Sequence, residues 1–214
     1  MFTGHRGRRW QRAASGPNAS ETDVNYIFET IVTVRGDAGR TQVTPLGVRQ
    51  QGDWVVLAPF KPSLTLDLLL QSRAAVINCT DDVRVFAGCI VGRRDWPLVP
   101  ATRVDGVRLA SCLAHEEIEL AEFIDHAQRP QLRCRSVHRE THAPFRGFNR
   151  AQAAVIEAAI LVSRLSILPA GKLEAELEYL KIAIDKTAGE SELQAWGWLM
   201  EAIAAHRDSG GPTR

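Results

Sequence analysis

The stretch Ile27-Phe28-Glu29-Thr30-Ile31-Val32-Thr33-Val34 decides the fold, because it is rich in β-branched residues and partly alternates apolar with polar side chains. This pattern predicts a β-strand. The run 35–40 has the glycines and aspartate of a turn, and residues 41–48 continue as a second strand that Pro45 and Gly47 interrupt. The first part of the chain is therefore expected to be built from strands joined by short turns.

Further short strands follow at close spacing, with one small helix among them. We expect strands over 54–57, 74–78, 85–91, 118–124 and 132–137, a helix over 65–72, and an irregular connection over 92–107. In the helix, Leu66, Leu69 and Leu70 share one side. Short strands with a single small helix favour an antiparallel barrel over alternating βαβ units. We assign this barrel domain to residues 24–143.

The remaining sequence has helical periodicity and forms a predicted C-terminal segment over 149–207. Asn149 with Gln152 is a variant of the capping box, and Ser191 with Gln194 repeats it. Pro169 suits the first turn of a helix. We expect helices over 149–165, 169–184 and 191–206. The fold class is thus α+β, an antiparallel barrel followed by a small helical segment.

Composition excludes several classes of protein. The 214 residues carry a formal net charge of +1, so no overall field favours nucleic acid or a membrane surface. Apolar runs are too short for a transmembrane helix. Residues 1–22 are rich in Gly, Ser, Asn and Arg and are expected to form a disordered basic tail. The chain lacks the motifs of Rossmann enzymes, P-loop NTPases, α/β-hydrolases and zincins.

Cysteine usage indicates a reducing compartment. None of the four cysteines belongs to a C-x-x-C pair, and each is flanked by strand-like sequence, as buried small hydrophobic residues usually are. We expect reduced thiols in a cytoplasmic protein. The four are Cys79, Cys89, Cys112 and Cys134.

Two predicted helix starts carry cations beside polar side chains. Lys61, Ser63 and Thr65 precede the small helix, where backbone N–H groups, the helix dipole and an ammonium group suit a phosphate. An ordinary N-cap by Ser63 or Thr65 explains the same residues. Arg146 and Arg150 flank the start of the first C-terminal helix and also suit an anion.

Three charged residues line one stripe of that C-terminal helix. Arg150, Glu157 and Arg164 are spaced by seven residues, and the other positions are largely apolar, so a barrel or a partner chain is expected to bury the helix. These three residues either form the solvent-exposed edge of the helix, or they form part of a functional site in which Glu157 orders an arginine. Both interpretations stay open at this point.

Two further polar groups lie at predicted strand ends. His138, Glu140 and His142 alternate along a strand and can share a face, as a metal site requires. Pro144 follows closely and no other cluster of ligands is evident, so we favour a polar strand end and expect no metal. Asn78 and Thr80 offer amide and hydroxyl groups to a ligand, or form a turn with local hydrogen bonds.

Several stretches together are similar to the DUF447 family of archaea and some bacteria. They are residues 28–33, 45–49, 61–65, 76–82 and 142–150, and the likeness extends over about residues 24–206. The resemblance implies an FMN-binding split barrel with a small helical C-terminal part. It also implies a homodimer that binds flavin at the shared face. In methylotrophic bacteria it implies a link to tetrahydromethanopterin-dependent one-carbon metabolism.

The resemblance also implies positions for a flavin. Pro45, Gly47, Val48 and Arg49 would lie along the ring. Lys61, Ser63 and Thr65 would hold the phosphate, a role that the helix-start argument reaches independently. Asn78 and Thr80 would approach the ribityl chain or the ring, and Arg146 and Asn149 would close the site.

Two functions follow from these observations. The first is an FMN-dependent reductase-type flavoprotein that takes hydride from a donor such as a reduced nicotinamide, with a pterin as a further substrate class. The second is a non-catalytic ligand-binding or assembly module whose apolar helices form a partner interface. Small molecules and a second copy of the chain are the expected partners, and nucleic acid and membrane are not.

Overall fold

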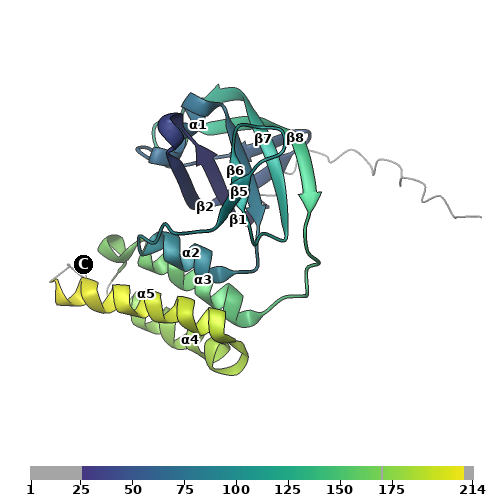
Figure 1. The fold of residues 1–214 in the computed structure, drawn as a ribbon. Helices are drawn as coiled ribbons and strands as arrows, with labels where there is room; N and C mark the ends of the chain where they lie inside the picture. The colour runs from purple at the N-terminus through teal and green to yellow at the C-terminus, as the bar shows by residue number, and fades with distance from the viewer. Residues whose placement is uncertain (1–25, 170, 210–214) are drawn as a thin grey trace, which may run out of the picture.

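The computed structural model describes residues 26–169 and 171–209, and the predicted tail 1–22 lies outside them. Six antiparallel strands close a barrel in the order β1-β2-β3-β8-β7-β4. Figure 1 shows helices α2 to α5 gathered on one side of this barrel. The predicted fold class, an antiparallel split barrel followed by a helical segment, is confirmed. The barrel strands are β1 (Phe28–Arg35), β2 (Thr41–Gln51), β3 (Trp54–Leu57), β4 (Ala74–Cys79), β7 (Ala114–Ile124) and β8 (Gln131–Thr141).

The remaining elements are one helix at the end of the barrel, a small hairpin and the helical group. They are η1 (Asp37–Gly39), α1 (Leu64–Ser72), α2 (Val83–Ile90), β5 (Leu98–Pro100), β6 (Val107–Leu109), α3 (Arg150–Val162), η2 (Leu165–Ile167), α4 (Lys172–Thr187) and α5 (Glu190–Asp208). No helix in the described part of the chain combines the length and the apolar character needed to cross a membrane.

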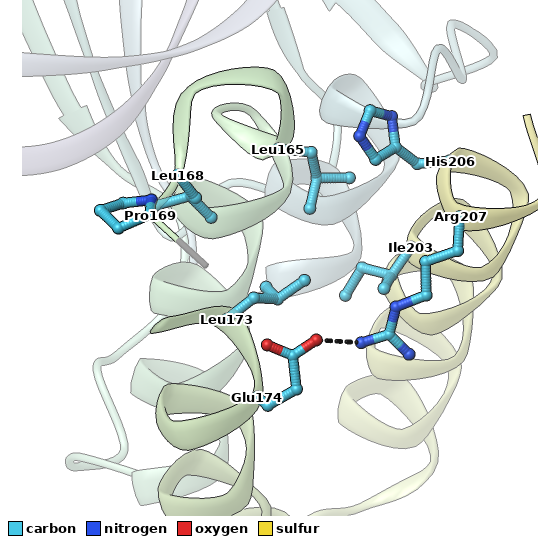
Figure 2. A pocket seen from close by; sticks show the side chains of 8 residues that line it. All are labelled: Leu165, Leu168, Pro169, Leu173, Glu174, Ile203, His206 and Arg207. Carbon is cyan, nitrogen blue, oxygen red and sulfur yellow. Dashed lines mark hydrogen bonds and ion pairs between the residues drawn. The ribbon is translucent and has the colours of Figure 1, made fainter. Parts of the chain in front are cut away.

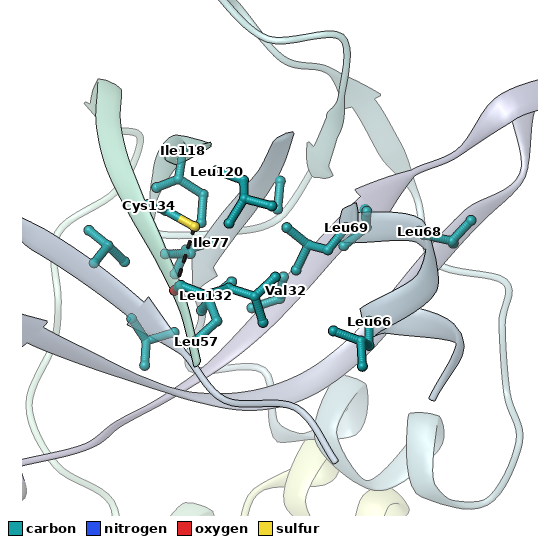
Figure 3. Packing of buried hydrophobic residues seen from close by; sticks show 14 residues of the cluster. Val32, Leu57, Leu66, Leu68, Leu69, Ile77, Ile118, Leu120, Leu132 and Cys134 are labelled. Atoms are coloured by element: carbon teal, nitrogen blue, oxygen red, sulfur yellow. Dashed lines mark hydrogen bonds between the residues drawn. The ribbon is translucent and has the colours of Figure 1, made fainter. Parts of the chain in front are cut away.

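The barrel core follows from alternation along the strands. On β1, Val32 and Val34 point inward, and they meet Leu57 of β3 and Leu132 of β8 in one buried cluster. Figure 3 shows how α1 adds Leu66, Leu68 and Leu69 to it. Leu68 takes the place predicted for Leu70, which is exposed. The alternate residues face outward, so one side of each strand is left for other elements.

Helix α2 corrects the prediction of a strand over 85–91. Its start is capped by Asp82, whose carboxylate accepts a hydrogen bond from the backbone N–H of Arg84 at 3.1 Å. Val85, Phe86 and Cys89 pack on the outer face of the barrel. The opposite side, with Val83 and Ala87, packs into the helical cluster. The run is only eight residues long, and Arg84 is its one charged residue. A short apolar run that contains valine and phenylalanine cannot be told from a buried strand by its period alone.

Helices α3, α4 and α5 form that second cluster, mostly through small and aliphatic residues. The start of α3 directly after Asn149 agrees with the prediction. Helix α4 starts at Lys172, three residues later than predicted, and α5 starts after Gly189 instead of Ser191. The division into domains over 24–143 and 149–207 stays a prediction. Helix α2 packs against both the barrel and the other helices, so it forms the contact between these two parts.

The connection over 92–107, predicted to be irregular, contains strand β5 and leads directly into β6, with which β5 pairs. Asn78 holds β6 against the barrel, since its side-chain oxygen accepts a hydrogen bond from the backbone N–H of Leu109 at 2.7 Å. All four cysteines are free thiols, and Cys79 is exposed instead of buried.

Candidate functional site

A cleft of about 340 Å³ lies between the outer face of β1 and β2, the segment before α1, and helices α2 and α3. Its volume is within the range of small-molecule sites, which are mostly apolar with a few polar groups. The walls fit that description, because aliphatic and aromatic residues dominate and only a few charged groups enter. The lining residues are Ile27, Glu29, Pro45, Leu46, Gly47, Phe60, Phe86, Ile90, Arg129, Ile156, Ala159, Ile160, Ser163 and Arg164.

Strand β2 brings two predicted site residues into the cleft. Pro45 and Gly47 alternate on its outer face, paired with Ile31 and Glu29 of β1. A Cβ atom at Gly47 would lie 2.6 Å from the side chain of Ile27, so any larger residue would displace Ile27 from its present place in the cleft wall. Val48 points into the barrel core and is buried. It can contribute only backbone groups to this surface.

Arg49 follows Gly47 on the same outer face of β2. Its Nε atom is buried and has no hydrogen-bond partner among the described residues. A buried donor without an acceptor costs free energy. An acceptor oxygen or nitrogen of a ligand laid along residues 45–49 would satisfy this donor. Arg49 is not among the residues that line the cleft, so its predicted contact with the ring stays a prediction.

The start of α1 is only partly capped. The hydroxyl oxygen of Ser63 accepts from the backbone N–H of Leu66 at 3.3 Å. The N–H groups of Leu64 and Thr65 have no partner within residues 26–169 and 171–209. The Lys61 ammonium donates to the carboxylate of Asp125. Two free donors, a helix dipole and a cation form a potential anion site.

Phe60 connects the cleft to this helix start, because it lines the cleft and directly precedes Lys61. The Arg129 guanidinium lies 4.5 Å from the centre of the Phe60 ring, and it donates to the carbonyl of Ala58 at 3.1 and 3.2 Å. Sequence reasoning missed both residues. Arg129 stands in the turn 128–130, and only the folded barrel reveals that this turn lies beside residues 58–61.

Asn78 and Thr80 are placed differently from the other predicted contacts. Asn78 is fully buried, and its amide nitrogen donates to the carbonyl of Ile31 and to the hydroxyl of Thr33. The Thr80 hydroxyl accepts from the backbone N–H of Asp82. Neither lines the cleft. The turn interpretation of this stretch therefore accounts for both side chains.

Arg146 and Asn149 lie at the far end of α3 from the cleft. Asn149 is seven residues, or about two turns, before Ile156, the first residue of α3 that lines the cleft. Its side-chain oxygen accepts from the N–H groups of Ala151 and Gln152, and its nitrogen donates to the carbonyl of Thr187. Arg146 is exposed in the preceding connection. Neither residue lines the cleft.

The electrostatics of the cleft combine one carboxylate with two guanidinium groups. Burial raises the pKa of Glu29, and the nearby Glu157 carboxylate raises it further. Arg129 and Arg164 supply the positive charge. Glu157 forms no ion pair with Arg150 or Arg164 in the described part of the chain, so the exposed-edge interpretation of the stripe is favoured.

A second cavity of about 180 Å³ lies between η2, α4 and α5. Figure 2 shows its apolar walls and the ion pair between Arg207 and Glu174 at 2.7 Å. None of the predicted site residues reaches it. We therefore take the cleft between barrel and helices as the candidate functional site.

The family comparison supports this fold. The N-terminal domain of a family described as "Protein of unknown function (DUF447)" matches residues 28–143, and its C-terminal part matches residues 149–201. The chain belongs to the DUF447 family. No curated protein matches this DUF447 chain.

Among solved structures, an FMN-bound DUF447 protein from Methanosarcina mazei is similar with a TM-score of 0.72 and 18% identity, covering 82% of this chain and 94% of that one. An FMN-binding protein from Thermus thermophilus has a TM-score of 0.47 and 20% identity, covering 63% and 80%. The 2-nitrobenzoate 2-nitroreductase of Pseudomonas fluorescens has a TM-score of 0.46 and 19% identity, covering 53% and 64%. The first of these establishes the shared fold of the DUF447 chain.

Proposed function

We propose that the chain is an FMN-binding flavoprotein of reductase type. The observation that carries this proposal is the partly capped start of α1, which lies directly beside a largely apolar cleft. A phosphate requires N–H donors and a cation, and a flavin ring requires an apolar slot of this kind. The similar DUF447 protein from Methanosarcina mazei is FMN-bound, which supports the same ligand here.

The α1 start would hold the phosphate. The N–H groups of Leu64 and Thr65 have no partner among the described residues, and the Ser63 hydroxyl lies in the same turn. Thr65 is buried, so its N–H group is accessible only if the ligand reaches into this turn. Lys61 would exchange its contact with Asp125 for a contact with the phosphate. Charge-assisted hydrogen bonds of this kind contribute about 1.5–3 kcal/mol each.

Strand β2 would support the ring. Pro45 and Gly47 give a surface without bulky side chains. Arg49 continues this face of β2 beyond the lining residues, and its buried, unpartnered Nε would have to become exposed to donate to a polar edge of the ring. Val48 contributes through its backbone only. Asn78, Thr80 and Asn149 are left out because their polar groups are already used within the chain. Arg146 is left out because it precedes α3, at the end of that helix far from the cleft.

Bound FMN would supply the hydride and electron transfer, so the protein needs no general acid or base of its own. The protein would orient the ring and exclude water. Phe86, Ile156 and Ile160 form the apolar wall opposite β2. A reduced nicotinamide is the proposed electron donor. A pterin one-carbon carrier is the proposed further substrate, supported by the resemblance to family members of methylotrophic bacteria.

We also propose that the working form is a homodimer. Exposed aromatic pairs support this, since Tyr26 stacks edge-on with Phe28 and Phe145 with Phe148. Phe148 is 99% exposed in the isolated chain. Exposed aromatic groups of this kind mark interaction surfaces. Light scattering of the purified chain would report twice the monomer mass if the proposal is correct.

Flavin titration of the purified chain tests the function. We expect yellow protein, or stoichiometric uptake of added FMN with quenching of flavin fluorescence, and release of the flavin on denaturation. Colourless protein that also fails to bind added FMN would favour the alternative, a non-catalytic ligand-binding or assembly module. Reduction of the bound flavin by a nicotinamide would then separate an enzyme from a flavin carrier.

A further inference from the structure

A second polar cluster lies away from the cleft, where β7 begins and β8 ends. Cys112, His115 and His142 each point one ligand atom into it, and these atoms all lie within 4.8 Å of one another. His115 is the second residue of β7, and His142 follows the last residue of β8. The pairing of Ala114 with Thr141 brings the two histidines together.

The two histidines are in direct contact. Nδ1 of His115 lies 2.9 Å from Nε2 of His142, and the rings are stacked with an interplanar angle of 5° and centroids 5.0 Å apart. A tetrahedral zinc ion with Zn–N bonds of about 2.0–2.1 Å separates two nitrogens by about 3.3 Å. A shift of a few tenths of an ångström gives the two nitrogens this spacing, and the exposed side chain of His142 can make it. The Cys112 sulfur lies within 4.8 Å of both nitrogens, and zinc binding would bring it to about 3.5 Å from them.

Glu117 fixes the orientation of His115. Its Oε1 lies 3.1 Å from Nε2 of His115, and both side chains are fully buried. The same carboxylate accepts from the backbone N–H groups of Thr102, Arg103 and Val104 at 2.6, 2.6 and 2.9 Å. An ionised carboxylate held so firmly keeps the proton on Nε2, which leaves the Nδ1 lone pair directed at Cys112 and His142.

This arrangement has the features of a metal site with an outer shell. Histidine ligands in proteins generally donate their second N–H to a carboxylate. Sulfur and imidazole ligands select zinc, and three protein ligands are typical of sites that keep a position for water. Cys112 and His115 are each 2% exposed, while His142 is exposed. The open position would therefore face solvent on the His142 side.

The local charges are compatible with a divalent ion. Binding would displace the Cys112 thiol proton and form a bond from the thiolate to the metal. Burial raises the pKa of the Cys112 thiol, and the Arg108 guanidinium, 4.0 Å from the sulfur, offsets part of that rise while it opposes the metal charge. The thiolate and Glu117 together supply two negative charges, which outweigh the one positive charge of Arg108.

We propose that Cys112, His115 and His142 bind a single zinc ion, with Glu117 as the positioning carboxylate. The expectation of no metal, drawn from His138, Glu140 and His142 alone, did not include the other two ligands. Only His142 of those three belongs to the proposed site. His115 and Cys112 lie 27 and 30 residues earlier, so their proximity to His142 arises from the barrel.

Cobalt and zinc titration of the tag-free full chain, after treatment with a chelator, tests the site. We expect one equivalent of Co²⁺ per chain, a near-ultraviolet thiolate-to-cobalt charge-transfer band, and visible bands of tetrahedral cobalt that zinc abolishes. His142 is exposed, so His142→Ala is expected to fold, and it should weaken zinc binding by at least about 100-fold. Substitution of a residue that only contacts a metal ligand typically costs less than this. Cys112→Ser should remove the charge-transfer band.

Matched variants keep this test specific. His126→Ala changes an exposed histidine in another loop, and Cys89→Ala changes a buried thiol elsewhere, so both should keep native affinity. His138→Gln should do the same, although His115, Glu117 and His138 form an alternative ligand trio. Substoichiometric cobalt without the charge-transfer band would overturn the proposal, as would loss of binding in His138→Gln with retention in Cys112→Ser. Neither readout depends on flavin.

Discussion

The starts of α1 and α3 look alike in sequence but differ in their unpaired donors. Each has a capping side chain and a nearby cation, Ser63 with Lys61 and Asn149 with Arg150. At α1, the N–H groups of Leu64 and Thr65 lack partners in the described residues. At α3, two of the first N–H groups are bonded to Asn149, and that of Ala151 also donates to Thr187.

The difference arises from tertiary contacts. The C-terminal residue of α4, Thr187, docks on the start of α3 and receives a hydrogen bond from the Asn149 amide at 3.0 Å. The start of α1 faces the turn after β7, where Asp125 contacts Lys61 and leaves the helix N–H groups free. The added tertiary contact at α3 leaves fewer N–H groups for an anion than remain at α1, and this difference cannot be read from the local motif.

A third group of backbone N–H donors, in residues 102–104, already binds a carboxylate of the chain itself. The three N–H groups of residues 102–104 already hold Glu117, and these hydrogen bonds lower its pKa from 4.5 to about 2 although burial opposes the shift. A lowered pKa in the folded state stabilises the protein above pH 4.5, and that stability is lost as pH falls toward 2. We expect a loss of about 3 kcal/mol over this window.

Urea unfolding at a series of pH values measures this loss. The variant Glu117→Gln should be less stable at neutral pH and should lose most of the pH dependence between about 4.5 and 2. An unchanged pH profile in the variant would show that other carboxylates cause the acid sensitivity.

The unbonded N–H groups at the start of α1 predict that substitutions there strongly weaken FMN binding. Lys61→Ala combined with Ser63→Ala should weaken FMN binding by about 100-fold, because charge-assisted hydrogen bonds to the phosphate are lost. Fluorescence titration gives the dissociation constant, and circular dichroism checks the fold. FMN affinity equal to that of the native chain would remove the α1 start from the site.

Asn149→Ala is the matched control for that variant. Both variants remove a helix cap, so both should lower the free energy of unfolding by about 1–2 kcal/mol. Only the α1 variant should lose FMN, since at α3 the N–H groups of Ala151 and Gln152 are already bonded within the chain and the helix start lies far from the cleft. Loss of FMN in Asn149→Ala, measured by the same titration, would place a ligand contact at α3 instead.

Asp125→Asn should have the smallest effect. Asp125 contacts Lys61 in the free protein, and the Lys61 side chain is only partly exposed. Removal of this competitor should tighten FMN binding by roughly two- to fivefold, since exposed ion pairs contribute up to about 1 kcal/mol. Weaker binding would mean that Asp125 positions Lys61 instead of competing for it.

The sequence predicted most of the barrel because its strands alternate and its turns are rich in glycine and proline. It missed α2, because an eight-residue apolar run with valine and phenylalanine is too short for its period to separate a helix from a buried strand. It also started the third C-terminal helix at Ser191. The actual cap is Gly189, whose N–H donates to the Glu192 carboxylate at 2.9 Å.

The candidate site was predictable only where the chain itself carries the signal. Pro45 and Gly47 share one face of a strand, and residues 61–65 span the start of a helix, so the first stretch lies at the cleft and the second beside it. Phe60 and Arg129 come together only when the barrel closes. Asn78 looked available in sequence, but the hairpin β5–β6 covers it and uses its amide.

The affinities for FMN and riboflavin test the central claim most directly, because the two ligands share the ring and ribityl chain and differ by the phosphate. The native chain should bind FMN about 100-fold more tightly than riboflavin. The Lys61→Ala, Ser63→Ala variant should bind both almost equally, with its riboflavin affinity unchanged. Equal binding of the two ligands by the native chain, or a preference for FMN that survives in the variant, would contradict a phosphate site at the start of α1.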